Sequence, residues 1–219
     1  MKTVKVMWAL GLTILVETSY AQEIYLQGGT QGIGIGAALA ISSWFGLHAD
    51  FNAINFSHNF SVGGNRYEDG VRLRQGGIYG DFFPWSNSGL RIIAGLRLTD
   101  DEVSGNSVPT NGTYTFKGKT TPAFPGEYAT ATVKYPTAMP YLGVGYGFRP
   151  AAKGFGLTAE LGVAYGIPHS SYSLSPALTQ AAGPALSQEI AATGLQQLRE
   201  KASPYRWYPT VQIGISYHF

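Results

Sequence analysis

The sequence predicts an all-β protein: a transmembrane, antiparallel, up-and-down β-barrel of eight strands with a short helix in its last external loop. Three observations lead to this fold class. Apolar and polar residues alternate over long segments, short and long connections follow one another along the chain, and an export signal stands at the N-terminus. The composition agrees, because only 13% of the 219 residues are charged, against about 25% in an ordinary soluble domain.

The N-terminus has the three parts of a secretory signal peptide. Two lysines precede the apolar run Val6–Val16, and Ser19-Tyr20-Ala21 has small residues at the two positions that matter for cleavage. A membrane-anchoring helix would need about 20 apolar residues, more than this run provides. We therefore expect a cleaved signal peptide at residues 1–21 and a barrel domain at residues 22–219.

Period-two alternation marks the strands. In "YRWYPTVQIGISYHF" every second residue from Tyr205 to Phe219 lies on one apolar face. The segments "FGLTAELGVAYGI" and "LRIIAGLRL" repeat the pattern, and in "PYLGVGYGF" the apolar face is Leu142, Val144, Tyr146 and Phe148. The predicted strands are, in order, 23–28, 32–41, 46–57, 70–83, 89–100, 135–148, 155–167 and 204–219.

The connections sort by length as they do in barrels with tight periplasmic turns and long external loops. Short connections are Ser42–Gly46, Pro84–Gly89 and Arg149–Gly154, and long ones lie near Ser57–Gly70, Thr99–Lys134 and Pro168–Pro204. A soluble β-sandwich also alternates. However, these apolar faces are long enough to cross a bilayer, and aromatic residues stand at their ends, which favours a membrane barrel.

The first strand is the weakest part of this assignment. Residues 23–28 are short of the 9–11 that a spanning strand needs. In an alternative arrangement, the glycine stretch is one long coiled strand and Gly112–Lys134 supplies the missing crossing.

The stretch "EIYLQGGTQGIGIGAALAI", Glu23–Ile41, is similar to the dinucleotide-binding loop of short-chain dehydrogenases. Asp50 even stands where such a loop would place its ribose-binding carboxylate. That family also needs a Tyr-x-x-x-Lys pair, and no tyrosine of this chain has a lysine four residues later. Because Gly32, Gly34 and Gly36 alternate with apolar residues, we interpret them as strand residues that face a crowded lumen.

The strand phasing predicts charged side chains inside the barrel. His48, Asp50, Asn52, Asp81 and Glu160 point inward together with arginines, although a bulge at Gly76-Gly77 could shift Asp81. Buried charges must be paired, so we expect a lumen charge network that fills the barrel, made of Asp50, Arg72, Arg74, Arg91, Arg97, Glu160 and Arg206. A structural network is favoured over a conducting pore, and the arginine excess would make any passage select anions.

Three short segments carry a resemblance to a known family. "PYLGVGYG" (Pro140–Gly147), "AELGVAYG" (Ala159–Gly166) and the terminal "SYHF" (Ser216–Phe219) resemble the small outer-membrane barrels of the OmpA, OmpX and OmpW type. The resemblance implies a monomer in the bacterial outer membrane, in contact with its lipids and lipopolysaccharide. It also implies that Tyr217 and Phe219 are read by the barrel-assembly machinery.

One segment departs from that group. "PALSQEIAATGLQQLREKA", Pro184–Ala202, predicts an amphipathic helix with Ile190, Ala191, Leu195 and Leu198 on one side. We expect it to cap the barrel, to lie on the lipopolysaccharide surface, or simply to be a loop with helical propensity.

No catalytic residue, cofactor or metal site is predicted. The sequence has no cysteine, its four histidines lack metal-ligand spacing, and a formal charge of +2 gives no reason to expect nucleic acid. His169-Ser170-Ser171 is the one candidate for a lipid A-modifying enzyme, and no second motif supports it. The expected role is structural or a surface interaction through long external loops, with a narrow, porin-like channel for small or hydrophobic solutes as the alternative.

Overall fold

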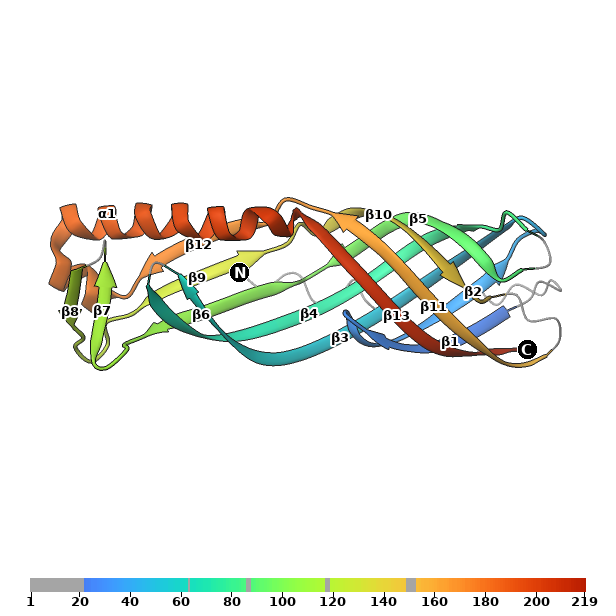
Figure 1. Cartoon of the computed structure of the whole chain (residues 1–219), viewed down its shortest axis with the longest axis horizontal. Coiled ribbons are helices and arrows are strands. Elements are labelled where there is room, and N and C mark those ends of the chain that lie inside the picture. Colours follow the sequence, from blue (N-terminus) through green and yellow to red (C-terminus); the bar gives the residue numbers. More distant parts are fainter. Residues whose placement is uncertain (1–21, 63, 86–87, 117–118, 149–152) are drawn as a thin grey trace, which may run out of the picture.

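The computed structural model describes residues 22–62, 64–85, 88–116, 119–148 and 153–219, so the expected signal peptide lies outside the described residues. The molecule is elongated and has two parts, a barrel and an outer compartment that continues from one end of it (Figure 1). The barrel strands are β1 (Gln22–Gly29), β2 (Gly32–Ala40), β3 (Phe45–Val62), β4 (Asn65–Phe82), β5 (Leu90–Thr99), β10 (Ala138–Tyr146), β11 (Gly154–Tyr165) and β13 (Trp207–His218).

These eight strands form a closed antiparallel barrel, as the sequence predicts. Each strand pairs with its two neighbours in the order β1-β2-β3-β4-β5-β10-β11-β13, and β1 pairs with β13 from Glu23–His218 to Gly29–Gln212. The first strand is therefore a real strand of 8 residues. The alternative that used 112–134 as a crossing is wrong, because the described residues of that range, including β7, β8 and β9, do not pair within the eight-stranded barrel.

A belt of apolar side chains faces outward around the barrel. Nearly every second residue of each strand contributes, as the alternation predicts, and the exposed members include Leu26, Ile33, Ile35, Phe51, Ile78, Ile92, Leu96, Leu142, Val144, Leu157, Leu161, Val211, Ile213 and Ile215. Aromatic pairs lie at both rims, with Tyr165 against Trp207 at one end and Phe155 against Tyr217 at the other. This surface is that of a membrane-spanning barrel. No helix in the described part of the chain is long and apolar enough to span a membrane.

Glycines on the inner face make room for large neighbours. A Cβ atom on Gly36 would lie 2.2 Å from Cζ of Tyr25, and one on Gly34 would lie 2.0 Å from Oδ1 of Asn52. The glycine stretch is thus a pair of barrel strands whose missing side chains let a tyrosine and an asparagine enter the lumen. It is not a nucleotide-binding loop.

Above the belt lies the outer compartment. It consists of residues 54–62 of β3, residues 65–74 of β4, strands β6 (Glu102–Val108), β9 (Ala129–Lys134) and β12 (His169–Leu174), the hairpin β7–β8 (Thr113–Phe116, Lys119–Pro122), and helix α1 (Pro176–Ala202). The sheet order here is β12-β9-β6-β4-β3. The helix runs back along β12 towards the barrel, and the short 3₁₀ helix η1 (Ser203–Arg206) leads into β13 (Figure 1). The segments predicted as long external loops are therefore mostly regular structure.

The predicted helix is present and begins earlier than expected, at Pro176. Ser175 caps its N-terminus by accepting a hydrogen bond from the backbone N–H of Leu178. The helix is kinked at Gly183, where φ is 73°, immediately before Pro184. Its buried side includes Gly194 and Leu198, where a Cβ atom on Gly194 would lie 2.5 Å from Cε1 of Tyr172. The helix therefore packs directly against β12.

The close approach of rings to inner glycines predicts a large cost for one added methyl group. A Cβ atom on Gly162 of β11 would lie 2.0 Å from the hydroxyl of Tyr141, whereas the nearest atom to one on Gly80 of β4 is 3.7 Å away. We expect Gly162→Ala to lower the free energy of unfolding in urea by about 1–3 kcal/mol and Gly80→Ala to leave it nearly unchanged. Equal effects of the two substitutions would contradict this packing.

Candidate functional site in the lumen and the outer compartment

A cluster of four titratable side chains crosses the lumen of the barrel. Nε of Arg91 lies 3.1 Å from Oδ1 of Asp81, and Nη2 of Arg91 lies 3.0 Å from Oε2 of Glu160. Nδ1 of His48 is 2.7 Å from Oδ2 of Asp81, and its Nε2 is 3.6 Å from Glu160. The residues come from β3, β4, β5 and β11, so this central cluster joins opposite walls of the barrel.

Aromatic side chains enclose the central cluster. The guanidinium carbon of Arg91 lies 3.9 Å from the ring centre of Phe148, and His48 stacks on Tyr79. Tyr25 and Phe83 are buried beside Phe148 and close the lumen at the end away from the outer compartment. The central cluster is therefore joined by ion pairs and buried away from solvent.

Phe148 is a correction to the predicted phasing, which placed it on the lipid face. The strand β10 ends at Tyr146. Gly147 and Phe148 then adopt positive φ angles of 118° and 61°, and the turn directs the phenyl ring into the lumen. Alternation could not reveal this because it holds only while the strand continues.

A second group of polar side chains lies between the central cluster and the outer compartment. Arg97 stands 4.5 Å from the ring centre of Tyr141 and donates to Gln75 at 3.4 Å. The hydroxyl of Tyr141 donates to Oε1 of Glu160 at 2.7 Å, which links the two groups. Gln75 donates in turn to Asp101 at 2.6 Å. The polar chain thus runs continuously from mid-barrel to the end of β5.

Two carboxyl groups complete this part of the lumen. Asp50 accepts a hydrogen bond of 2.8 Å from Gln27. Asp101 follows β5, outside the spanning strands, and its burial raises its pKa to about 7, although the backbone N–H of Arg74 and the Gln75 amide both donate to it. Both carboxyl groups are held by amide donors and not by an arginine side chain.

Three of the arginines predicted in the lumen network lie outside it. Arg72 is exposed on the outer surface, 3.7 Å from Asp100 and 3.8 Å from Glu102, and Arg74 is exposed on the same face. Arg206 is exposed on η1 and donates to the carbonyl of Ser203. The prediction that these three arginines belong to the lumen network is therefore wrong.

The error in β4 has a physical cause. The strand pairs with β3 in one register from Phe45–Phe82 to Val62–Asn65, so no bulge occurs at Gly76-Gly77. In the barrel half of β4 the apolar residues face lipid and the polar ones face the lumen. In the outer half the assignment is reversed, and Val71 and Leu73 face inward because the interior there is apolar. The arginines between them must then face water.

The charge balance of the lumen is the opposite of the expected one. Among the described residues, the inward carboxyl groups are Glu23, Asp50, Asp81, Asp101 and Glu160, whereas the inward arginines are Arg91 and Arg97. An acidic excess replaces the arginine excess. The inward position of Glu23 could not be predicted, because Glu23 lies in the first strand, whose short alternating pattern did not fix which residues face the lumen.

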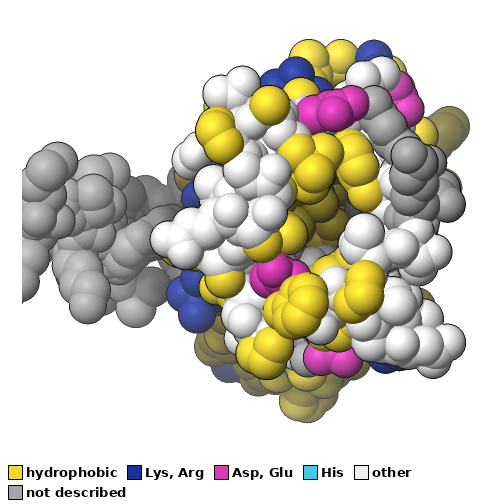
Figure 2. Space-filling view, turned by 90° about the vertical axis from the view of Figure 1, so that its left-hand side faces the viewer, with side chains coloured by type: hydrophobic (Ala, Val, Ile, Leu, Met, Phe, Trp, Pro, Cys, Tyr) yellow, Lys and Arg dark blue, Asp and Glu magenta, His cyan; other side chains and the backbone are white. Residues whose placement is uncertain are grey.

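The inner wall of the outer compartment is apolar. Ile54 and Phe56 stand on the same face of β3 as His48, yet 36% and 46% of their surfaces are exposed. Deeper in the compartment, Tyr67 is buried and its hydroxyl lies 2.7 Å from that of Tyr172. Burial raises the pKa of both phenols, so both stay neutral. Seen from this end, the molecule is hollowed, with hydrophobic side chains lining the hollow (Figure 2). We call this space the vestibule.

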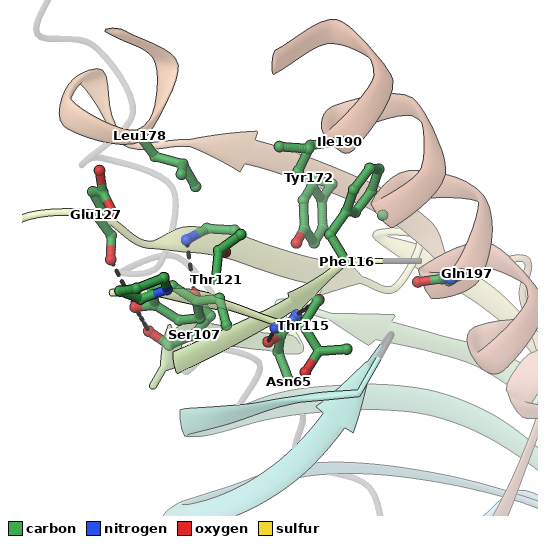
Figure 3. A pocket seen from close by; sticks show the side chains of 14 residues that line it. Asn65, Ser107, Thr115, Phe116, Thr121, Glu127, Tyr172, Leu178, Ile190 and Gln197 are labelled. Carbon is green, nitrogen blue, oxygen red and sulfur yellow. Dashed lines mark hydrogen bonds between the residues drawn. The ribbon is translucent and has the colours of Figure 1, made fainter. Parts of the chain in front are cut away.

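A smaller pocket of about 100 Å³ lies between α1, β12 and the β7–β8 hairpin (Figure 3). Asn65 holds the hairpin in place, because its amide donates to the carbonyl of Thr115 at 2.7 Å and accepts from the N–H of Thr115 at 2.8 Å. Tyr172, Phe116 and Ile190 form the apolar side of the pocket. The space suits a few waters or a small amphipathic molecule.

The outward face of β6, β9 and β12 is rich in hydroxyl groups. Ser104 and Thr132 share a hydrogen bond of 2.9 Å, and Thr130 donates to Asn106 at 2.7 Å. Ser171 and Ser173 of β12 stand opposite Thr132 and Thr130. We call this polar surface, formed by Ser104, Asn106, Thr130, Thr132, Ser171 and Ser173, the hydroxyl face.

The catalytic candidate His169-Ser170-Ser171 lies on β12. His169 is exposed and faces outward, and Ser170 points to the opposite side, towards α1. No hydrogen bond joins His169 to either serine within the described ranges. The same residues contain no group of three or more carboxylates and histidines that could hold a metal ion.

Comparison with known proteins identifies similar folds. No family model matches the sequence, and no curated protein matches it. The crystal structure of Acinetobacter baumannii CarO2 aligns over 92% of this chain and 100% of that one, with a TM-score of 0.61 and 20% identity. That of Acinetobacter baumannii CarO covers 90% and 97%, with a TM-score of 0.54 and 18% identity. A major outer membrane protein from Thermus thermophilus gives a TM-score of 0.44 at 13% identity, over 92% and 100%. The chain therefore has the fold of the small outer-membrane barrels.

Removing the shared cation of the central cluster is expected to destabilise the barrel strongly. Arg91→Met leaves the carboxylates of Asp81 and Glu160 buried without their partner, and we expect a loss of about 3–5 kcal/mol in the free energy of unfolding. Adding Asp81→Asn and Glu160→Gln to the same chain should restore most of the lost free energy of unfolding, because neither carboxylate is then buried without its arginine partner.

The matched control is Arg72→Met, which removes the two solvent-exposed ion pairs of Arg72 with Asp100 and Glu102. Its effect should stay within about 0.5 kcal/mol. Urea titration of the folded protein in detergent micelles measures all three variants. If Arg91→Met were as mild as Arg72→Met, the cluster would not hold the walls together.

Proposed function

We propose that the protein is an integral outer-membrane barrel whose lumen is closed and whose role is a surface interaction carried by its outer compartment. It acts as a monomer, surrounded by outer-membrane lipids and lipopolysaccharide. It is inserted by the barrel-assembly machinery through a C-terminal strand that ends with Tyr217 and Phe219 on the outward face.

The observation that carries this proposal is the packing of the lumen. Side chains of opposite walls meet in the central cluster, and Tyr25, Phe83 and Phe148 cover it on the side away from the outer compartment. Buried ion pairs of this kind are costly to break, because each separated charge stays desolvated. A barrel filled in this way supports a role outside its lumen.

The outer compartment offers the surface for such a role. It is a paired extension of the barrel wall, braced by α1, and not a set of separate loops. Its hydroxyl face presents donors and acceptors without net charge. This chemistry suits an uncharged polar partner such as a glycan or a polar protein surface.

A second candidate function is favoured by the vestibule. Exposed Ile54 and Phe56 on an inner wall are unusual, because inward apolar side chains normally pack against each other. They would bind a small hydrophobic solute. The central cluster then makes the vestibule a dead end in the resting state, so passage would require the cluster to open.

A lipid-modifying activity has the least support. A nucleophile and its base must lie within hydrogen-bond reach, and neighbouring residues of β12 direct His169 and Ser170 to opposite faces. We propose no enzymatic activity and no cofactor.

The proposed orientation can be tested with single cysteines, since the native chain has none. Gln188→Cys lies exposed on α1, and Lys153→Cys lies exposed at the opposite end of the barrel. A membrane-impermeant maleimide should label Gln188→Cys on intact cells and Lys153→Cys only after the outer membrane is permeabilised. The reverse pattern, or labelling of neither in a membrane fraction, would reject a surface role for the outer compartment.

The closed lumen predicts the electrical behaviour of the protein. Reconstituted in a planar bilayer, the native chain should give no discrete conductance steps. A variant with His48, Asp81 and Arg91 all replaced by serine removes the bulk of the central cluster and serves as the positive control, with conductance expected. Steps of equal size in both proteins would favour the channel over the surface role.

A further inference from the structure

A cavity of about 310 Å³ lies at the foot of α1, apart from both the lumen and the vestibule. It opens between the end of the helix and the start of β12. Its lining residues are Ile167, Pro168, His169, Ser170, Arg199, Ala202, Ser203 and Arg206. We call it the foot cavity.

The foot cavity lies just outside the apolar belt. The backbone N–H of Gly166 donates to the carbonyl of Arg206 at 2.9 Å, which fixes η1 beside the end of β11. Immediately below, the rings of Tyr165 and Trp207 lie 4.7 Å apart at the outer rim of the belt. Tyrosine and tryptophan mark the level of lipid headgroups in membrane barrels. The cavity is therefore at headgroup height.

Its charge is positive and unbalanced. Among the residues that the structure describes, neither Arg199 nor Arg206 has a carboxylate within ion-pair distance, whereas Arg72, Arg91 and Lys134 all do. Glu200, the neighbour of Arg199, instead accepts a hydrogen bond from Gln196. Two guanidinium groups thus line one cavity without an internal anion.

A buried donor also lacks a partner there. The hydroxyl of Ser170 is inaccessible to solvent and makes no hydrogen bond with any described residue. A buried hydroxyl without a hydrogen-bond partner is unfavourable. Ser170 is one of the residues that line the foot cavity together with the two arginines.

The rim of the foot cavity is apolar on its membrane side. Ile167, Tyr205 and Trp207 are all more than half exposed. An anion carried on an acyl chain could therefore place its chain against these side chains and its charge against the arginines. A free anion gains nothing from such a rim.

We propose that the foot cavity binds a phosphate group of an outer-leaflet glycolipid. Arg199 and Arg206 contact the phosphate oxygens, for which the guanidinium fork is well shaped. The bound lipid ties the end of α1 to the membrane and so sets the position of the outer compartment. This inference rests on the proposed outward orientation of that compartment.

Lipid binding by the purified full mature chain in zwitterionic detergent micelles tests the proposal without depending on cellular orientation. The probes are diphosphorylated lipid A, the same lipid after phosphatase treatment, and inorganic phosphate. The variant is Arg199→Gln with Arg206→Gln. The matched control, Arg66→Gln with Lys153→Gln, removes the same two positive charges from exposed positions at the two ends of the molecule.

We expect the native chain and the control to bind diphosphorylated lipid A at least tenfold more tightly than the dephosphorylated lipid. The foot-cavity variant should lose about tenfold in affinity, and Arg199→Lys with Arg206→Lys should fall between, because lysine keeps charge but not the bidentate fork. A difference in electrophoretic mobility between boiled and unboiled samples checks that every variant is folded.

Two outcomes would overturn the proposal. In one, the foot-cavity variant binds lipid A as well as the control does. In the other, inorganic phosphate binds as tightly as lipid A, which would assign the site to a free anion. Cysteine labelling that rejects the orientation would leave this micelle measurement interpretable, so the two failures are distinguishable.

Discussion

The structure depends on one constraint, that backbone N–H and C=O groups inside a membrane must all be hydrogen-bonded within the protein. The pairing of β1 with β13 meets it by removing both sheet edges. Outside the apolar belt, water satisfies backbone groups and the constraint ends. There the wall continues with five strands, and α1 lies along β12 where further strands would otherwise be needed. The closed barrel gives way to the open five-stranded wall where strands are interrupted, between β5 and β6, between β9 and β10, and between β11 and β12.

Closure with only eight strands also determines what the lumen contains. A barrel of this size is just wide enough to be filled by side chains, so large residues and glycines must complement each other across it. Tyr141 over Gly162 and Tyr25 over Gly36 are two such pairs. The remaining charged side chains are buried and must pair, which gives the central cluster around Arg91. A small closed barrel filled in this way leaves its outer compartment as the surface on which a function can be built.

Much of the barrel could be predicted from alternation, because every second residue of a membrane-spanning strand faces lipid and must be apolar. Arg91, Arg97 and Glu160 were phased correctly for this reason. The rule fails where the surroundings change: above the belt, Val71 and Leu73 turn inward and expose Arg72, and below it Gly147 redirects Phe148 into the lumen. Strands β6, β9 and β12 were interpreted as loops since small polar residues alternate there with small apolar ones, without the contrast that a lipid face requires. Pairing between distant residues, such as His48 with Asp81, leaves no local signal.

Barrel closure is the central claim, and a disulfide between the first and last strands tests it directly. Leu26 and Ile215 are directly opposed on β1 and β13, and both face outward. Opposed residues of an antiparallel pair lie about 4.5–5.5 Å apart at Cα, within disulfide reach. In a chain without other cysteines, Leu26→Cys with Ile215→Cys should form an intramolecular disulfide in the folded protein. Leu26→Cys with Leu142→Cys should not, because β10 is not a neighbour of β1. If the first pair fails to cross-link, or if both pairs cross-link equally, the barrel is not closed in this way.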